Sequence, residues 1–372
     1  MNEFKDVSTP VFICEMEKLE RNLKVLDRIQ KESGAKILLS LKGFALYESF
    51  GLIRTYLSGA SASSLNETKL AAEKFKKELH TYLPAYKEEE VERIAMLSDT
   101  VIFNSLEQWH CYYPLIKESA SCGVRLNLEL PFNTPPPCNP NRLHSRLGVR
   151  VPELLLAIPK GLEGLHIHAL CAQNSDALEQ MIEGLEKHFS PLLKKLKWLN
   201  LGGGHSMTHD NYDTKHLIKI VQALYKRYPQ LSIYLEPSEA VVHESGVLVT
   251  TVLDIIHNGI DIAILDISVE VHMTDLLITK VTPNLRESSP TGSYVYELAG
   301  VSCAAGDVFG TYAFEAPLSI GQTLVFENQM QYSMVKTTSF NGINAASIAI
   351  KERDGTLRMV KEFGYADYLR RL

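Results

Sequence analysis

The sequence predicts an α/β protein in which a (β/α)8 barrel of the TIM type is joined to a second, mainly β domain. In the first two thirds of the chain, short apolar runs rich in β-forming residues alternate with helical stretches. From about residue 247 the alternation stops, and strand-like runs follow one another. Alternating strands and helices imply a parallel sheet, and eight such repeats imply closure into a barrel. An open, doubly wound sheet is the alternative, but it would seldom need eight units.

The elements of the barrel can be placed in chain order. A short strand at Val11–Cys14 precedes a helix at Glu15–Glu32, whose apolar residues recur on one face. Later segments, such as 176–188 and 214–227, combine helical spacing with charged outer faces. The eight barrel strands are predicted at Ile37–Leu41, Gly59–Ser63, His80–Leu83, Val101–Asn104, Val124–Glu129, Gly164–His168, Trp198–Gly202 and Ile233–Glu236.

The second domain begins where strands replace the alternating pattern. We place the barrel domain at residues 10–255 and the β domain at 256–372, with residues 1–9 expected to join the latter. The proline-rich segment Leu130–Asn141 suits neither helix nor strand, and its Pro135–Pro137 run is predicted to be a loop over the barrel mouth or a rigid surface turn. The later strands are predicted at Val247–Ile256, Ala263–Ile267, Leu276–Val281, Tyr294–Val301, Thr323–Glu327, Tyr332–Thr338 and Leu357–Phe363.

The composition is that of an ordinary globular protein, with 45% hydrophobic and 22% charged residues. The formal net charge of −6 argues against a nucleic-acid partner and favours a small cationic one. The six cysteines are scattered without a CxxC pair, and no segment approaches the ~20 apolar residues of a membrane span. We therefore expect a cytoplasmic protein without a membrane partner.

Lys42 is the first candidate for chemistry. It follows the apolar run Ile37–Leu41 and precedes Gly43, so a buried strand would deliver its side chain into an open mouth. Partial desolvation lowers the pKa of such an amine, which can then attack a carbonyl and form a Schiff base. A surface lysine just past a strand is the simpler interpretation. Whether Lys42 has a chemical role therefore depends on the residues at the other strand ends.

The last three predicted barrel strands end in polar residues or glycine. His166 and His168 share one side of their strand, and His168 stands at its end. His168 could be a core residue, a metal ligand or a ring that stacks on a flat cofactor. The run Gly202–Gly204 could bring backbone amides to a phosphate, although tight turns also use glycine. Glu236 could be a general base or hold a protonated ring nitrogen. With the Lys42 amine, these groups meet the requirements of pyridoxal 5'-phosphate (PLP).

The β domain carries two further candidates. Cys303 and Asp307 lie between glycines in GVSCAAGDVFG, a pattern that a merely buried cysteine would not need. Tyr332 precedes the polar corner Ser339–Asn341, and its hydroxyl could bind a phosphate oxygen. The sequence alone leaves a packing role open for each of them.

The motifs that hold these residues resemble those of a known family. In their order over nearly the whole chain, they are similar to the motifs of the fold type III PLP-dependent decarboxylases. Within that superfamily, the residues of the motifs are most similar to those of the carboxynorspermidine/carboxyspermidine decarboxylases. The motifs are jointly specific, although most are not specific singly. They are LLSLKGFA, FNSLEQ, SRLGV, HIHALC, NLGGGH, YLEPSEA, LDISVEVHMTD, SCAAGD and SFNG.

The resemblance implies a barrel of the alanine racemase type and a homodimer with shared active sites, in which Cys303 and Asp307 enter the partner's site. It implies that Lys42 holds PLP as a Schiff base, that His168 stacks on the ring and that Glu236 pairs with the pyridine nitrogen. The remaining cofactor contacts that it implies are Arg146 near the phenolic oxygen of the ring, and Gly202, Gly203, Gly204 and Tyr332 at the phosphate.

The implied reaction is the decarboxylation of carboxynorspermidine or carboxyspermidine to norspermidine or spermidine, in polyamine biosynthesis. Cys303 would return a proton to the carbanion. Glu239 stands where related enzymes often carry arginine, which suits a cationic polyamine tail, and His272, Asp275 and Asp307 are further candidates for holding that tail.

Three residues depart from the family pattern, namely Ala172 in place of glutamate, Ser238 in place of glycine and Thr274 in place of proline. They leave the cofactor set intact and put the exact substrate in question. Diaminopimelate or ornithine decarboxylation, a non-catalytic PLP-binding regulator, and a metal-dependent hydrolase built on His166 and His168 are the alternatives. The hydrolase lacks clear acidic partners in the sequence.

Overall fold

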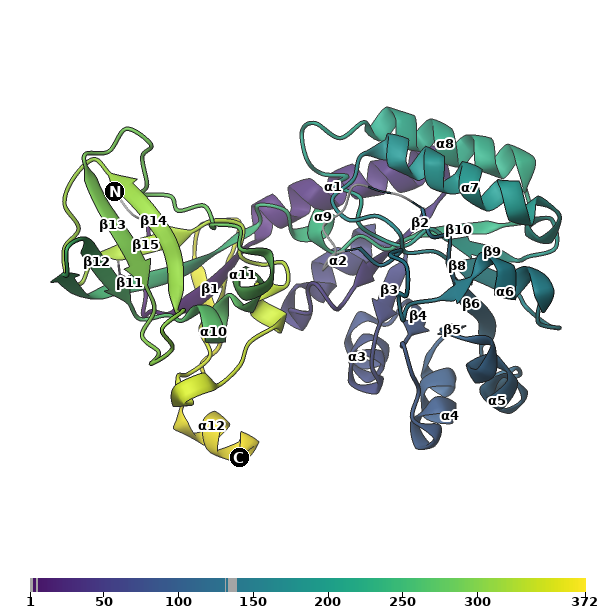
Figure 1. Ribbon diagram of the computed structural model, residues 1–372, viewed down its shortest axis with the longest axis horizontal. Helices are drawn as coiled ribbons and strands as arrows, with labels where there is room; N and C mark the ends of the chain where they lie inside the picture. Colours follow the sequence, from purple (N-terminus) through teal and green to yellow (C-terminus); the bar gives the residue numbers. More distant parts are fainter. Residues whose placement is uncertain (1–2, 5, 131, 133–138) are drawn as a thin grey trace. The chain divides into compact units, whose positions relative to one another are not determined.

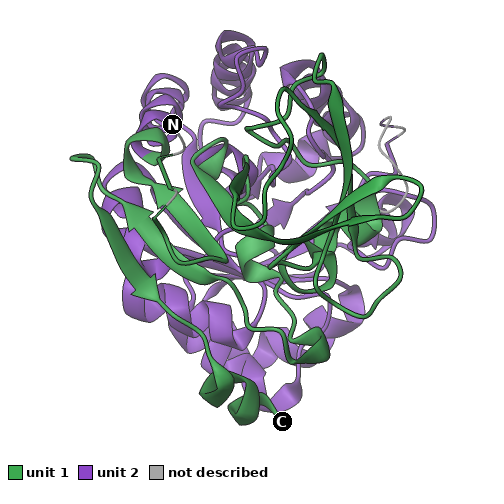
Figure 2. Cartoon of the chain, turned by 90° about the vertical axis from the view of Figure 1, so that its left-hand side faces the viewer, with its two compact units in different colours: residues 1–19, 242–372 green, residues 20–241 purple. Residues whose placement is uncertain are grey.

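The computed structural model describes residues 3–4, 6–130, 132 and 139–372, so the Pro135–Pro137 run lies outside the described residues. The chain divides into two compact units (Figure 2). Residues 20–241 form the barrel unit, and residues 1–19 with 242–372 form the β unit. Each unit has its own sheet and its own core.

The barrel unit is a closed sheet of eight parallel strands with helices around it (Figure 1). The last strand pairs with the first, where Leu235 lies opposite Ile37, and this contact closes the barrel. The predicted fold class is therefore confirmed, and all eight predicted strands are present. They are β2 (Lys36–Ser40), β3 (Gly59–Ala62), β4 (Glu78–Tyr82), β5 (Thr100–Phe103), β6 (Ser121–Asn127), β8 (Gly164–His166), β9 (Trp198–Asn200) and β10 (Ser232–Leu235), with a short β7 (Val149–Arg150) beside β6.

Several helices around the barrel begin at a residue whose side chain caps the first turn. The side chains of Ser64, Ser105 and Asp213 each accept a backbone N–H in the first turn of the helix that follows. None of the helices in the described ranges combines the length and the apolar character needed to cross a bilayer. The helices are α1 (Met16–Ser33), α2 (Phe50–Tyr56), α3 (Leu65–Leu70), α4 (Glu88–Leu97), α5 (Leu106–Ile116), α6 (Val151–Leu156), α7 (Ser175–Leu193), α8 (Thr214–Arg227) and α9 (Glu239–Val242).

Trp198 fills part of the barrel interior against glycines on neighbouring strands. Its ring belongs to a buried cluster with Leu38, Ile102 and Tyr234. A Cβ atom at Gly164 would lie 1.9 Å from the indole, and one at Gly123 would lie 2.3 Å from it. Because real Cβ atoms do not approach so closely, the two glycines on β8 and β6 make the space that the indole occupies.

The β unit is built on an eight-stranded mixed sheet. The strand order is β14, β13, β12, β11, β1, β16, β17, and β15 also pairs with β11. Three short helices accompany the sheet in the part of the chain that is described, α10 (Val269–His272), α11 (Thr274–Thr279) and α12 (Tyr365–Arg371). The strands are β1 (Val11–Glu15), β11 (Gly246–His257), β12 (Asp261–Leu265), β13 (Tyr294–Ala299), β14 (Val308–Phe314), β15 (Thr323–Phe326), β16 (Ser347–Lys351) and β17 (Leu357–Lys361).

The limits of the units differ from the predicted 10–255 and 256–372 because β1 belongs to the β sheet. Val11 pairs with Val249 of β11 on one side and with Ser347 of β16 on the other. Val11 and Val249 are buried in one cluster with Phe4. The start of the chain therefore joins the β unit through residue 19 rather than residue 9, and the barrel ends before β11.

Two predicted strands of the β unit are wrong. The strand predicted at Leu276–Val281 is helix α11, which ends at Lys280 with a positive φ of 55°. The strand predicted at Tyr332–Thr338 holds a single 3-10 turn at Ser333–Val335. Short apolar runs do not separate helix from strand by period alone, and for the same reason the pattern missed β14 and β16.

The packing of Trp198 gives a stability prediction. Gly164→Ala is expected to lower the free energy of unfolding by about 1–3 kcal/mol or more, because the added methyl group collides with the indole. Gly51→Ala is the matched control, since a Cβ at Gly51 in α2 meets nothing within 4 Å and alanine favours a helix. Thermal and denaturant unfolding would measure both, and equal stability of the two variants would contradict the proposed packing.

Candidate active site

The carboxyl ends of the barrel strands surround a cavity of about 180 Å³. Lys42, His168 and Glu236 all line it. They follow β2, β8 and β10, which the closed barrel brings to one mouth although they are far apart in the sequence. The structure therefore brings together three residues that the sequence predicts to act on one cofactor.

Lys42 has an amine suited to nucleophilic chemistry. The side chain is half-buried, and its Nζ lies 3.4 Å from Nε2 of His168. Burial lowers the pKa of the amine, and the positive charge of Arg125 lowers it further. A larger fraction of the amine is thus neutral, and nucleophilic, at a given pH.

His168 is held by the glycine run. The N–H of Gly203 donates to Nδ1 of His168 at 3.1 Å. Burial, followed by the charges of Lys42 and Arg125, lowers the pKa of His168 well below its usual value. Since a backbone N–H can only donate, the neutral ring accepts at Nδ1 and carries its proton on Nε2, facing the Lys42 amine. A neutral ring in a fixed orientation suits stacking on a flat cofactor.

Glu236 provides a buried anion. Its Oε1 accepts a hydrogen bond of 2.7 Å from the Asn200 amide, and its Oε2 lies 3.5 Å from Nε2 of His166. Burial alone would raise the pKa of the carboxyl, but the neighbouring His166 and His80 and the Asn200 donor lower it to about 2. Both ring nitrogens of His166 are without a hydrogen-bond partner among the described residues. The carboxylate of Glu236 can therefore accept a hydrogen bond from a further donor.

Arg125, on β6, is the arginine that lines the cavity. Its guanidinium lies 4.7 Å from the centre of the Tyr82 ring and donates to the carbonyl oxygen of His168 at 3.1 Å. Arg146, which we predict beside the cofactor ring, is exposed and does not line this cavity. The contacts therefore favour Arg125 over Arg146 for that role, because Arg125 points inward from a barrel strand and Arg146 follows in a loop.

The glycine run packs tightly against the neighbouring strand ends. A Cβ atom at Gly202, Gly203 or Gly204 would lie within 2.4 Å of a backbone oxygen, and Gly202 and Gly204 have φ values of 69° and 87°. The N–H of Gly202 donates to Asn200, and that of Gly203 donates to His168. Close packing therefore explains the glycines, and a phosphate cradle would have to use the Gly204 amide and the residues after it.

Cys303 and Asp307 lie in the β unit and differ in exposure. Cys303 is exposed, and its N–H donates to the Asn341 side chain at 2.9 Å. Asp307 is buried, with its two carboxylate oxygens accepting the N–H groups of Val269 and Ser302 at 2.7 and 3.0 Å. These contacts make Asp307 an anchor of its loop and give no support to the predicted substrate contact.

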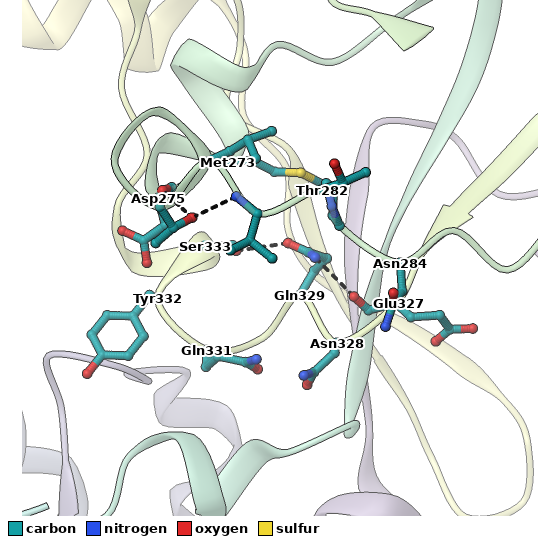
Figure 3. Close-up of a pocket in the computed structure, with 14 residues that line it drawn as sticks. Met273, Asp275, Thr282, Asn284, Glu327, Asn328, Gln329, Gln331, Tyr332 and Ser333 are labelled. Carbon is teal, nitrogen blue, oxygen red and sulfur yellow. Dashed lines mark hydrogen bonds between the residues drawn. The ribbon is translucent and has the colours of Figure 1, made fainter. Parts of the chain in front are cut away.

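His272 has a similar structural role, whereas Asp275 and Tyr332 line a cavity of about 310 Å³ in the β unit (Figure 3). His272 is fully buried, and its ring bonds to the backbone of Ser268 and Asn344. Asp275 forms an ion pair with Lys336, whose amine also lies 4.7 Å from the centre of the Tyr332 ring. His272 is thus occupied by the fold, while Asp275 and Tyr332 remain accessible from a cavity.

Glu239 lies in the barrel unit at the start of α9. Its carboxylate contacts Nε2 of His209 at 2.7 Å. Both side chains are partly exposed, so the pair adds a half-buried carboxylate close in sequence to Glu236. This placement is compatible with the predicted contact to a cationic tail.

Comparison with known families decides what kind of protein carries this site. A family model described as pyridoxal-dependent decarboxylase, C-terminal sheet domain, matches residues 25–329. The chain belongs to the pyridoxal-dependent decarboxylases. Because this match covers most of the chain, PLP is the cofactor, and the resemblance found in the sequence is confirmed.

This decarboxylase is similar over its full length to curated relatives. A carboxyaminopropylagmatine decarboxylase of Synechocystis sp. is 41% identical, with 98% of this chain and 95% of the relative covered. A carboxynorspermidine/carboxyspermidine decarboxylase of Campylobacter jejuni is 39% identical, with 98% of each chain covered. The crystal structure of the carboxynorspermidine decarboxylase from C. jejuni, complexed with norspermidine, has a TM-score of 0.92 at 38% identity and covers 98% of this chain and 100% of that one.

The cavity of this decarboxylase fits PLP on its own chemistry. A buried carboxylate with a pKa of about 2 matches a protonated ring nitrogen, because two opposite charges stabilise each other. The amine of Lys42, with its lowered pKa, matches the carbonyl carbon of the cofactor. A neutral His168 beside that amine completes the set.

The metal-dependent alternative finds a geometric group but poor electrostatics. His166, His168 and Glu236 offer ligand atoms within 4.8 Å of one another, so Glu236 would be the acidic partner that this alternative needs. However, burial and then the charges of Lys42 and Arg125 lower the pKa of His168, so basic side chains already stand beside this group. A divalent cation would add to this positive charge, which makes PLP the better occupant.

Arg125 and His80, which line the cavity, and Asn200, which contacts Glu236 from behind it, are not predicted from the sequence. Arg125 carried one signal, a charged residue inside an otherwise buried strand run, Val124–Glu129. Asn200 is a polar residue near the end of a predicted strand, directly before the glycine run. His80 carried no signal that separates the barrel interior from its outer face.

The lowered pKa of Lys42 can be measured in the cofactor-free protein. Acetylation with acetic anhydride across a pH series, followed by mass spectrometry, should label Lys42 at lower pH than exposed lysines such as Lys160. In Arg125→Met the acetylation of Lys42 should begin at a higher pH than in the wild-type protein, because a positive neighbour is lost. Labelling of Lys42 in parallel with Lys160, unchanged in the variant, would contradict the environment described.

Proposed function

We propose that this protein removes the carboxylate of a carboxylated polyamine, with carboxynorspermidine or carboxyspermidine as substrate and norspermidine or spermidine as product. The observation that carries the chemistry is the meeting of Lys42, His168 and Glu236 in one barrel cavity. Support for the substrate comes from the 39% identity to the C. jejuni enzyme over 98% of both chains. The cytoplasmic location expected from the sequence stays a prediction.

In this proposal, the barrel residues hold the cofactor and tune it. Lys42 would hold PLP at its carbonyl carbon, Glu236 would pair with the ring nitrogen, and His168 would stack on the ring. When bound, PLP supplies an electron sink that stabilises the negative charge left on the α-carbon after carbon dioxide leaves. Glu236 supports this because an anion with a pKa of about 2 keeps the ring nitrogen protonated.

The substrate tail is proposed to contact acidic side chains. Glu239 and Asp275 are partly exposed carboxylates, each already paired with a basic side chain, and a cationic tail could take the place of that partner. The net charge of −6 favours the approach of a cation. Because one methylene discriminates by only about 1–3 kcal/mol, these contacts do not separate carboxynorspermidine from carboxyspermidine.

A second candidate substrate is carboxyaminopropylagmatine. It is favoured by the 41% identity to the Synechocystis decarboxylase named for it. This compound carries a guanidinium at the end of the tail, whereas the spermidine derivatives end in an ammonium. A planar guanidinium needs two acceptor oxygens in a fixed orientation, so the two substrates make different demands on the same carboxylates.

The role of Lys42 and the choice of substrate can be tested together. Purified protein should show the absorbance of bound PLP, and Lys42→Ala should lose both this covalent signature and decarboxylation, because the amine that binds the cofactor is removed. The wild-type protein should be assayed on carboxynorspermidine, carboxyspermidine, carboxyaminopropylagmatine and diaminopimelate by carbon dioxide release. Preference for diaminopimelate, or activity retained in Lys42→Ala, would refute the proposal.

We further propose a homodimer in which Cys303 of one subunit serves as proton donor in the barrel of the other. The exposure of Cys303 and the hydrogen bond that fixes its backbone support a presented, ordered side chain. Cys303→Ala should then reduce turnover by about 10²–10⁴-fold, the usual contribution of a positioned acid.

Mixing of inactive variants tests the shared site. Lys42→Ala and Cys303→Ala, unfolded and refolded together, should recover roughly one quarter of the wild-type sites. About half of the dimers would be mixed, and each mixed dimer has one intact site out of two. Lys42→Ala mixed with Glu236→Gln is the control and should recover nothing, since both changes lie in the barrel. No recovery in the first mixture would show that Cys303 does not act across subunits.

A further inference from the structure

Asn200, the last residue of β9, joins the two parts of the barrel that are proposed to hold PLP. Its side chain is fully buried. The amide nitrogen lies 2.7 Å from Oε1 of Glu236, and the amide oxygen lies 2.9 Å from the N–H of Gly202. One side chain therefore contacts both the carboxylate and the first residue of the glycine run.

The orientation of this amide follows from its partners. The N–H of Gly202 can only donate, so the atom that faces it must be Oδ1. Nδ2 then has two hydrogens, one for Glu236 and one for Nδ1 of His80 at 3.3 Å. His80 accepts at Nδ1, and its Nε2 lies 3.6 Å from Oε1 of Glu78. Asn200 is thus fixed on three sides.

This arrangement leaves the second oxygen of Glu236 for another donor. Asn200 occupies Oε1, while Oε2 lies 3.5 Å from His166 without a hydrogen bond between them. A carboxylate that pairs with a ring nitrogen must be ionised and correctly oriented before the ring arrives. A neutral amide donor meets both needs, since it stabilises the anion and adds no competing charge.

We propose that Asn200 is a positioning residue that orients the Glu236 carboxylate toward the cofactor ring and couples it to the Gly202–Gly204 run, with His80 fixing the Asn200 amide. This inference rests on the proposed role of Glu236. A purely structural role for Asn200 would require only its bond to Gly202, so the test must change the Glu236 contact and keep that bond.

Asn200→Asp makes this separation. The new carboxylate can still accept from Gly202, but it places two acids at hydrogen-bond distance, which cannot both be ionised. We expect the cofactor-free variant to bind PLP roughly tenfold or more weakly, as for the loss of a hydrogen bond to a charged group. The absorbance of the bound cofactor should also differ from that of wild type. Asn174→Asp, at the cap of α7, is the matched control and should bind PLP normally.

The double variant Asn200→Asp with Glu236→Gln isolates the pair. The amide introduced at position 236 can donate to the carboxylate introduced at position 200, so the hydrogen bond is restored in the opposite sense. We expect the melting temperature of the cofactor-free protein to rise above that of Asn200→Asp, while PLP binding stays weak because position 236 is no longer charged. His80→Phe should weaken PLP binding less than Asn200→Asp, and an unchanged affinity would remove His80 from the proposal.

The outcomes separate a failure of the inference about Asn200 from a failure of the proposed role of Glu236. Wild-type PLP affinity and absorbance in Asn200→Asp, with a loss in Glu236→Gln, would overturn the inference alone. Wild-type PLP affinity and absorbance in Glu236→Gln would overturn the proposed role of Glu236 itself. If Asn200→Asp does not fold, recovery of a folded protein in the double variant supports the pair. If neither Asn200→Asp nor the double variant folds, Asn200 has a structural role only, and the inference is overturned.

Discussion

The ionised carboxylate of Glu236 inside the barrel is the interaction on which the rest of the site depends. Burial of an unpaired carboxylate costs several kcal/mol, so such a group persists only where the fold supplies donors. Here the donor is the amide of Asn200, and histidines on β8 and β4 surround the carboxylate. The pKa of about 2 means that the charge is present throughout the physiological range. A flat, protonated ring is the ligand that such a charge fits.

Barrel closure is what brings this carboxylate to the amine. β10 pairs directly with β2, so the residues that follow them, Glu236 and Lys42, emerge at adjacent places on one rim. An open sheet with these strands at its two edges would hold them apart. The same closure places Arg125, on β6, close enough for its charge to lower the pKa of Lys42. The amine is therefore tuned by a residue on a strand that does not pair with its own.

The sequence predicted the barrel and the residues at strand ends better than those inside it. The end of a parallel strand is marked by a local change from apolar residues to glycine or a polar residue, which made Lys42, His168 and Glu236 visible. Arg125 lies within β6, where alternation does not say which face is the barrel interior. Asn200 ends β9, but the predicted strand continues past it to Gly202, so Asn200 did not stand out as a strand end. The family resemblance implies Arg146 instead, through the motif SRLGV, and the structure shows Arg146 exposed. Long-range pairing accounts for the differences in the fold, since nothing within Val11–Glu15 indicates that this strand lies between β11 and β16, both of which come more than two hundred residues later.

The β unit separates residues that build a loop from a residue that the loop presents. Asp307 and His272 are buried, and their side chains bond to backbone groups, so each satisfies the loop around it. Cys303 is exposed, and its backbone N–H is held by Asn341. Asn341 has a positive φ of 55°, a conformation that asparagine tolerates better than most residues. The polar corner SFNG thus has a structural reason, which is to hold the backbone of Cys303 while its thiol stays exposed.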